Sequence, residues 1–176
     1  ALEEVSVLKI RIKYAKTGVL RYIGHLDVMR YFQKAIRRAG LDVAYSQGYS
    51  PHQLITFAAP LGLGVTSEGE YFDAEMNSLT SSEDMVTRLN ATMAPGMEVK
   101  DIVQLKEGAK TAMAVVAASD YLITCREGYG DIHDFTDALD AFYSQEQIEV
   151  VKVSKTKETQ MDIKPFIYKL EVGENG

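Results

Sequence analysis

The order in which strand and helix patterns follow one another limits the folds open to this chain more than any other feature. Apolar side chains that alternate with polar ones predict a strand, and apolar side chains that recur every three or four residues predict a helix. In the first part of the chain, strand patterns cover residues 5–14, 41–45, 54–58, 70–76 and 97–105. Helix patterns cover about 24–39 and the stretch from a capping box at 80–83 to Pro95-Gly96.

This order corresponds to the ferredoxin-like split βαβ plan: strand, helix, strand, strand, helix, strand. Residues 70–76 are counted either as a hairpin partner of 54–58 or as its continuation past a bulge. In this plan the helices cover one face of the sheet and leave the other face open. The outer face of 5–14 would be basic, because Lys9, Arg11 and Lys13 alternate with the apolar positions.

A second series of patterns begins after a polar connector. It contains a strand over 113–124, a helix capped by Asp131, and strands over 148–153 and 161–172, the last interrupted by Pro165. A second copy of the same plan would need one more helix and one more strand. We therefore expect an α+β protein with two ferredoxin-like domains in tandem, complete over residues 1–106 and incomplete over residues 107–176.

Charge is distributed unevenly along the chain. The net charge is −6 in total, but it divides into +5 over residues 1–52, −12 over 53–149 and +1 over 150–176. Such asymmetry suggests a localised anionic partner for the first third. The alternative is that the basic segment packs against the acidic middle of the chain.

Several classes of protein are disfavoured by the sequence. No apolar run approaches the roughly 18–20 residues that a membrane helix needs, and no secretory leader opens the chain. The single cysteine, Cys125, lies in an apolar run and suits a buried, inert thiol in the cytoplasm. No Cys/His spacing indicates a metal or iron–sulfur site, and we expect no cofactor.

Residues 21–52 contain most of the side chains that could bind an anion. His25 stands at a helix start, where backbone N–H groups bind phosphates, and it is the candidate for a general base. His52 lies in a loop with Tyr45 and Tyr49, and such aromatics can stack unpaired bases. Structural alternatives are a packed or helix-capping His25, a solvated basic helix surface, and tyrosines that complete the core; His133 suits a helix surface. The predicted anion-binding residues are Arg21, His25, Arg30, Lys34, Arg37, Arg38, Tyr45, Tyr49 and His52.

Six short runs closely resemble the bacterial radical SAM-linked family, a domain of unknown function fused to or encoded beside a radical SAM enzyme. These runs are 13–18, 21–27, 37–40, 45–52, 60–65 and 162–167. The chain departs from the family at Gln53-Leu54, where a proline–lysine pair is expected. The resemblance implies a radical SAM protein as partner and a setting near ribosome and RNA-processing genes, and it implies no activity. The three closely spaced cysteines of the radical SAM cluster are absent, so this chain is not itself the radical enzyme.

Three functions remain open from the sequence. The first, which we favour, is a non-catalytic module that binds RNA or presents a substrate to the radical SAM enzyme. The second is a metal-independent RNA-cleaving enzyme of tandem ferredoxin-like type that uses His25 as its base. The third is a protein-only adaptor whose acidic middle, residues 68–149, docks a basic partner.

Overall fold

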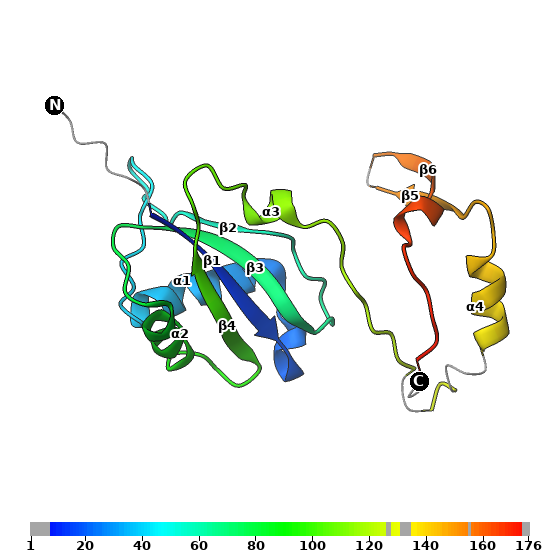
Figure 1. Ribbon diagram of the computed structural model, residues 1–176, viewed down its shortest axis with the longest axis horizontal. Helices are drawn as coiled ribbons and strands as arrows, with labels where there is room; N and C mark the ends of the chain where they lie inside the picture. Colours follow the sequence, from blue (N-terminus) through cyan, green and yellow to red (C-terminus); the bar gives the residue numbers. More distant parts are fainter. Residues whose placement is uncertain (1–7, 126–127, 131–134, 155, 174–176) are drawn as a thin grey trace. The chain divides into compact units, whose positions relative to one another are not determined.

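The chain forms two compact units, which divide between Ser119 and Asp120 (Figure 1). The computed structural model describes residues 8–125, 128–130, 135–154 and 156–173. The first unit contains a four-stranded antiparallel sheet with helices, and the second contains a two-stranded sheet. The first unit extends past the boundary expected after residue 106 and includes the short helix α3 (Ala112–Val115).

The first unit has the ferredoxin-like strand order β2-β3-β1-β4, with each neighbouring pair antiparallel. Its elements before α3 are β1 (Leu8–Lys16), η1 (Gly18–Tyr22), α1 (His25–Arg38), β2 (Ile55–Phe57), β3 (Ser67–Met76), α2 (Ser82–Asn90) and β4 (Met97–Gln104). The α+β, ferredoxin-like prediction is therefore confirmed. β3 is the hairpin partner of β2, which settles the alternative that the pattern at 70–76 left open.

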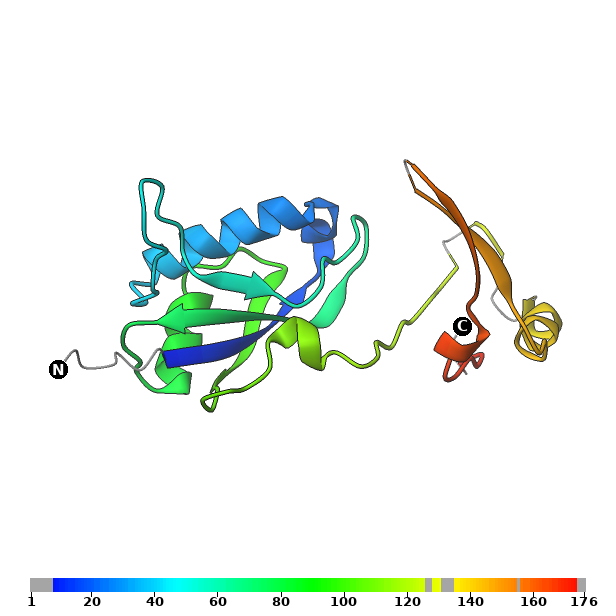
Figure 2. The same cartoon turned by 90° about the horizontal axis from the view of Figure 1, so that it is seen from above.

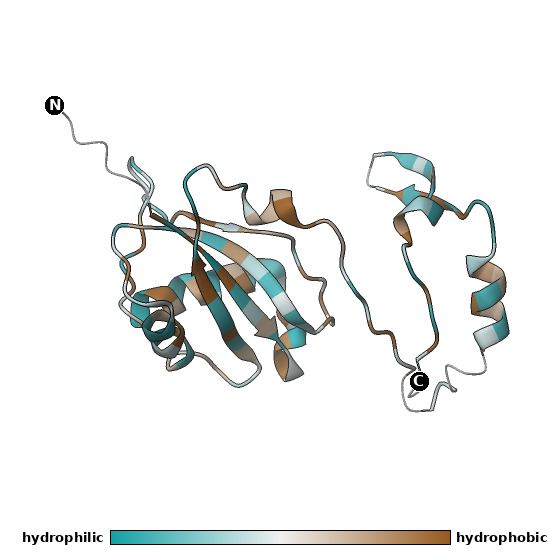
Figure 3. Ribbon diagram, viewed as in Figure 1, coloured by the Kyte–Doolittle hydropathy of each residue, from teal (hydrophilic) through white to brown (hydrophobic). Residues whose placement is uncertain are grey.

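One face of the sheet carries the core, as the alternation in β1 predicted. Ile10, Ile12 and Tyr14 are buried there, and they belong to the same apolar cluster as Phe32 of α1 and Leu89 of α2. The hydrophobic bands on the strands and helices are visible in Figure 3. Both helices therefore cover the same face, which is the arrangement that the split βαβ plan requires.

The edge of the sheet beside β3 is interrupted by a loop. The strand expected at 41–45 is wrong, because these residues make only isolated bridges, Val43 with Met76 and Tyr45 with Gln53. The N–H of Leu54 donates to the carbonyl of Ala44 at 2.9 Å, so the chain leaves the edge after Ala44 and returns to it at Leu54. The turn-forming residues between them form a loop that projects from the edge.

The cap of α2 lies one residue later than the capping box at 80–83 predicted. Ser81 is the N-cap, and its Oγ accepts a hydrogen bond from the N–H of Asp84 at 3.2 Å. Thr80 instead donates from Oγ1 to Oδ2 of Asp84 at 2.6 Å. The same residue types satisfy the helix start, with the serine rather than the threonine bound to the backbone.

The outer face of the sheet is partly covered rather than open. The N–H of Ala112 donates to Oδ2 of Asp73 at 2.7 Å, and Arg11 Nη2 donates to the carbonyl of Lys110 at 2.8 Å. Ala112 is fully buried as a result. Figure 2 shows α1 on one side of the sheet and α3 on the other.

The second unit consists of α4 (Thr136–Tyr143), the hairpin of β5 (Glu149–Val153) and β6 (Glu158–Asp162), and η3 (Lys164–Phe166). Two strand predictions from the second half of the chain fail. Residues 113–124 contain the end of α3 followed by irregular chain. The strand predicted at 161–172 is cut short: β6 ends at Asp162 because Pro165, which has no N–H, lies in the short helix η3. The predicted cap Asp131 and His133 lie outside the described residues.

The second unit has little core of its own. Ile148 is the only buried hydrophobic residue that its described part contains. Cys125 is half-buried. Across the described part of the chain, no helix is long and apolar enough to cross a membrane.

Candidate functional site

Two cations of β1, Lys9 and Arg11, are neutralised by carboxylates of the neighbouring strand β3. Lys9 Nζ lies 3.0 Å from Oε1 of Glu75, and Arg11 Nε lies 2.8 Å from Oδ1 of Asp73. Lys13 places its ammonium 5.9 Å from the centre of the Tyr71 ring. For Lys9 and Arg11, the alternative in which basic residues pack against the acidic middle of the chain holds.

The outer side of α1 keeps its positive charge. Arg30, Lys34 and Arg37 are exposed and follow one another at helical spacing, so they lie on one side of the helix. Together with exposed Arg38 we call them the α1 basic face. At 1.5 Å per residue the four cations extend over about 12 Å of helix axis.

Carboxylates neutralise little of the α1 basic face. Arg30 Nη1 lies 3.4 Å from Oδ1 of Asp27, with both side chains more than 60% exposed, and exposed pairs of this kind are weak. Arg38 donates from Nη2 to the carbonyl of Thr92 at 3.1 Å, which is a neutral acceptor. The face therefore presents a net positive charge to solvent.

His25 lies on the other side of α1, toward the core. Its ring stands edge-on to Phe57, with ring centres 5.5 Å apart and an interplanar angle of 90°. It does not cap the helix, because the N-cap is Gly24 and no side-chain cap bond is made there. Among the described side chains, none forms a hydrogen bond with the imidazole, and the packing is that of a structural histidine.

Arg21 and Tyr22 form an exposed pair next to the start of α1. The guanidinium carbon lies 4.8 Å from the centre of the Tyr22 ring, and Nη2 donates to the phenol oxygen at 2.9 Å. The carbonyl of Arg21 accepts from the N–H of Gly64 at 2.8 Å, which brings the loop after β2 to the same place. Exposed apolar residues lie within five positions of Arg21 or next to Gly64 in the sequence, and we call them the Tyr22 corner: Val19, Tyr22, Leu26, Leu63 and Val65.

Lys16 is a buried cation beside this corner that sequence patterns did not single out. Its side chain is among the largest fully buried ones, and Nζ donates to the carbonyl of Ile23 at 3.1 Å. Burial away from water lowers the pKa of the amine, and the charge of nearby Glu70 partly opposes this shift. The lysine fixes the chain just before Gly24, where α1 begins.

His52 closes the loop at the sheet edge through Ser46. Ser46 Oγ lies 2.8 Å from Nδ1 of His52 and also accepts from the N–H of His52 at 3.1 Å. The direction of the bond between Oγ and Nδ1 depends on the tautomer of the ring, because a hydroxyl can donate one hydrogen bond and accept two. Tyr49 is fully exposed at the loop tip, and the phenol of Tyr45 accepts from Gln53 Nε2 at 3.3 Å.

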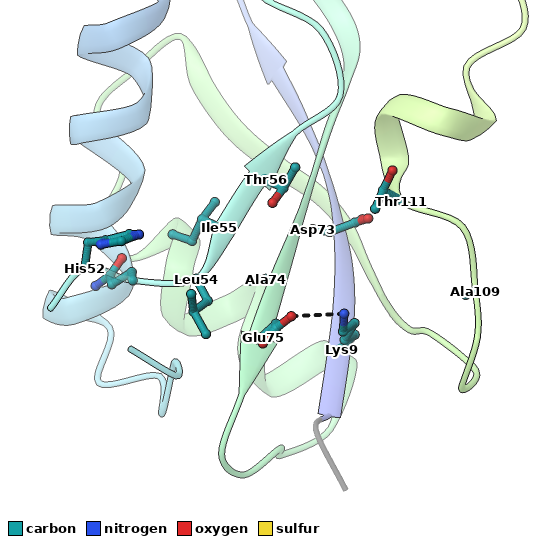
Figure 4. Close-up of a pocket in the computed structure, with 11 residues that line it drawn as sticks. Lys9, His52, Leu54, Ile55, Thr56, Asp73, Ala74, Glu75, Ala109 and Thr111 are labelled. Atoms are coloured by element: carbon teal, nitrogen blue, oxygen red, sulfur yellow. Dashed lines mark ion pairs between the residues drawn. The ribbon is translucent and has the colours of Figure 1, made fainter. Parts of the chain in front are cut away.

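A groove of about 210 Å³ runs along the edge strand beside His52 (Figure 4). Its lining includes the Lys9–Glu75 ion pair and Gln53, whose Oε1 is buried without a hydrogen-bond partner. His25 is not among the lining residues. Phe57, whose ring His25 contacts, follows His52 by five positions of nearly extended chain. Five such steps span up to about 16 Å.

The predicted site residues thus occupy four places rather than one. Arg30, Lys34, Arg37 and Arg38 form the α1 basic face, Arg21 lies beside Tyr22, His25 packs on Phe57, and Tyr45, Tyr49 and His52 belong to the edge loop. Ser46 and Gln53, which hold that loop, were not predicted, although the departure from the family at Gln53 was a signal. In the part of the chain that the structure describes, no group of three His, Cys, Asp or Glu residues is placed to hold a metal ion.

Comparison with known families identifies the family of the chain and no activity. Residues 9–175 match the family model described as uncharacterised protein conserved in bacteria, DUF2344, and the chain belongs to that family. No curated protein matches the chain.

Proposed function

We propose that this member of the uncharacterised bacterial family is a non-catalytic module that binds RNA through the α1 basic face. The observation that carries the proposal is the contrast between the two basic elements. In β1, Lys9 and Arg11 are paired with Glu75 and Asp73, whereas the cations of α1 meet a single exposed carboxylate, Asp27. A row of exposed cations on one helix is suited to phosphates, which lie at regular intervals along a nucleic-acid strand.

A local interface of this kind is compatible with the acidic protein as a whole. The net charge of −6 repels a polyanion from most of the surface and leaves the α1 basic face as the favourable approach. The position of His25 supports a non-catalytic role, because its imidazole packs on Phe57 on the side of α1 away from the cations.

We extend the proposal to the cellular setting through the resemblance to the radical SAM-linked family. The module would act in the cytoplasm beside a radical SAM protein and would hold the RNA that the enzyme modifies. Support for this part comes from the sequence runs that the family shares, among them 21–27 and 60–65, which meet at the bond between Gly64 and Arg21.

The test is RNA affinity as a function of salt, with two charge-reversal variants that are matched in number. Lys34→Glu with Arg37→Glu changes the α1 basic face. Lys106→Glu with Lys110→Glu makes the same charge change on the exposed connector after β4. Fluorescence anisotropy of a short labelled single-stranded RNA gives the dissociation constant of each protein at several salt concentrations.

We expect the first variant to bind more weakly, with a slope of log affinity against log salt that is shallower by about 1.4, because each phosphate contact on a single strand contributes about 0.7. The connector variant should keep most of the wild-type slope. Wild-type protein that does not bind RNA at low salt, or two variants that weaken binding equally, would contradict the proposal.

A further inference from the structure

We infer that the Tyr22 corner stacks an unpaired RNA base, so that the protein selects single-stranded RNA over duplex. This inference rests on the proposed function and names the substrate class of the same surface. It is carried by the geometry of Arg21 and Tyr22, by the apolar side chains around them, and by the continuity of the corner with the α1 basic face.

The Tyr22 ring has the form of a one-sided stacking platform. The Arg21 guanidinium lies over the ring, with its carbon 4.8 Å from the ring centre, and is held there by its bond to the phenol oxygen at 2.9 Å. Yet 60% of the residue's surface is exposed to solvent. One face of the ring is thus covered by a cation that polarises it, and the ring can stack a planar, electron-rich group.

The surroundings of the ring favour a base rather than a phosphate. Leu26 and Leu63 are 64% and 68% exposed; Leu26 lies in the first turn of α1, and Leu63 precedes Gly64, whose N–H donates to the carbonyl of Arg21. Exposed apolar surface of this kind gains free energy when a flat, weakly hydrated ring covers it. Leu26 and Leu63 offer a phosphate no hydrogen bond in exchange for the water that it would lose on contact with them.

The corner is continuous with the α1 basic face. Leu26 precedes Arg30 by four residues, so the two side chains neighbour each other on the exposed side of the helix. Lys34 and Arg37 continue the same line. A strand whose phosphates follow these cations toward the start of α1 reaches the Tyr22 corner, where its next base can turn onto the ring.

Stacking on Tyr22 requires a base whose face is free. In an RNA duplex both faces of each internal base are covered by its neighbours, and proteins read duplex RNA mainly through shape, phosphates and hydroxyls. A duplex can therefore reach the cations of α1 but cannot occupy the corner. This difference predicts a preference that charge alone would not produce.

The experiment compares one labelled RNA strand, alone and annealed to its complement, at one salt concentration. The proteins are wild type, Tyr22→Ala, Tyr22→Phe and, as a control, Tyr121→Ala, which removes an exposed tyrosine from the second unit. A strand carrying the fluorescent base 2-aminopurine reports stacking directly, because stacking quenches its emission. Circular dichroism establishes that all four proteins are folded.

We expect wild type to prefer the single strand and to quench 2-aminopurine. Tyr22→Ala should weaken single-strand binding roughly tenfold, leave duplex binding and the salt slope unchanged, and lose the quenching. Tyr22→Phe should keep the preference, and Tyr121→Ala should behave as wild type. Salt-dependent binding with equal affinity for both forms, or with no effect of Tyr22→Ala, would overturn the inference alone and leave the corner as a surface for an apolar protein partner. Absence of all RNA binding would overturn the proposed function as well.

Discussion

Arg11 and Asp73 form a two-bond ion pair across β1 and β3, with Nε 2.8 Å from Oδ1 and Nη2 3.1 Å from Oδ2. The side chains are only 17% and 11% exposed, and the hydrogen bonds to Asp73 raise the pKa of the guanidinium further. Oδ2 of Asp73 also accepts from the N–H of Ala112 at 2.7 Å. One carboxylate therefore joins the sheet to the segment that covers its outer face.

Asp73→Ala should destabilise the protein more than Arg11→Ala does. The first change leaves a nearly buried guanidinium and the buried N–H of Ala112 without their acceptor, and we expect a loss of about 3–4 kcal/mol. The second leaves Asp73 bound to Ala112, and we expect a loss of about 2 kcal/mol. Urea unfolding measures both. The control is Lys9→Ala, whose exposed pair with Glu75 should be worth about 0.5 kcal/mol; a larger loss for Arg11→Ala than for Asp73→Ala would contradict the argument.

Lys16 should make the stability of the protein rise with pH on the alkaline side of neutrality. Burial lowers the pKa of its amine in the folded protein below the ordinary value of 10.5. Between the two pKa values the unfolded chain binds more protons, so the free energy of unfolding increases as pH rises toward 10.5. Lys16→Met removes this dependence, and the difference in stability between wild type and variant should grow in favour of wild type from pH 7 to pH 10.

The measurement for Lys16 is urea unfolding of both proteins at each pH, with Lys106→Met as an exposed control. Tyr14 acts in the opposite sense, because burial and the charge of Glu70 raise its pKa, so the folded protein loses stability above about pH 10. Taking the difference between wild type and Lys16→Met removes that contribution, since both proteins contain Tyr14. Parallel stability curves for the two would show that the amine titrates normally.

The fold could be predicted from the sequence where one periodicity continued for a whole element. The alternation in β1 and the helical spacing of α1 gave elements that agree with the structure to within a few residues. The strand predicted at 41–45 is wrong, because its residues make only isolated bridges before the chain enters the loop that Ser46 and His52 close. Residues 113–124 failed for another reason: an apolar run without alternation does not distinguish a strand from a short helix and irregular chain.

The candidate site was predicted as a set of residue types but not as a geometry. Helical spacing correctly placed Arg30, Lys34 and Arg37 on one exposed side. The same spacing aligns His25 with the core positions of α1. The prediction nevertheless grouped His25 with the cations, because His25 and the cations lie in one stretch of sequence. Neighbours across the sheet, such as Asp73 opposite Arg11, are separated by 62 positions, and no local pattern reveals them.

Asn90 should protect the outer edge of β4 from pairing with other strands. Its Nδ2 donates to the carbonyl of Val99 at 2.9 Å, and its Oδ1 accepts from the N–H of Val99 at 2.8 Å, as a neighbouring strand would. Asn90→Ala frees both groups, and we expect a loss of about 1–3 kcal/mol together with a greater tendency to self-associate. Unfolding and sedimentation velocity measure the two effects, and Asn90→Asp, which keeps only the acceptor, should lie between.

Gly96 and Gly48 offer a matched test of how much a close backbone approach contributes to the fold. Both have positive φ, +93° and +110°, so alanine is strained at either position. A Cβ at Gly96 would lie 2.7 Å from the carbonyl oxygen of Thr17, whereas a Cβ at Gly48 would meet nothing within 4 Å. Thr17 cannot move away easily, because its N–H donates to the carbonyl of Gly96 at 2.7 Å.

Gly48→Ala therefore measures backbone strain alone, and we expect a loss of about 1–2 kcal/mol. Gly96→Ala adds the steric overlap and the weakened bond to Thr17, which we expect to cost about 1–3 kcal/mol more. Urea unfolding of both variants gives the difference, and the urea dependence of the unfolding free energy should be unchanged if both keep the fold. Equal losses at the two positions would mean that the turn before β4 yields to a methyl group, and that its contact with Thr17 does not hold β1 and β4 in register.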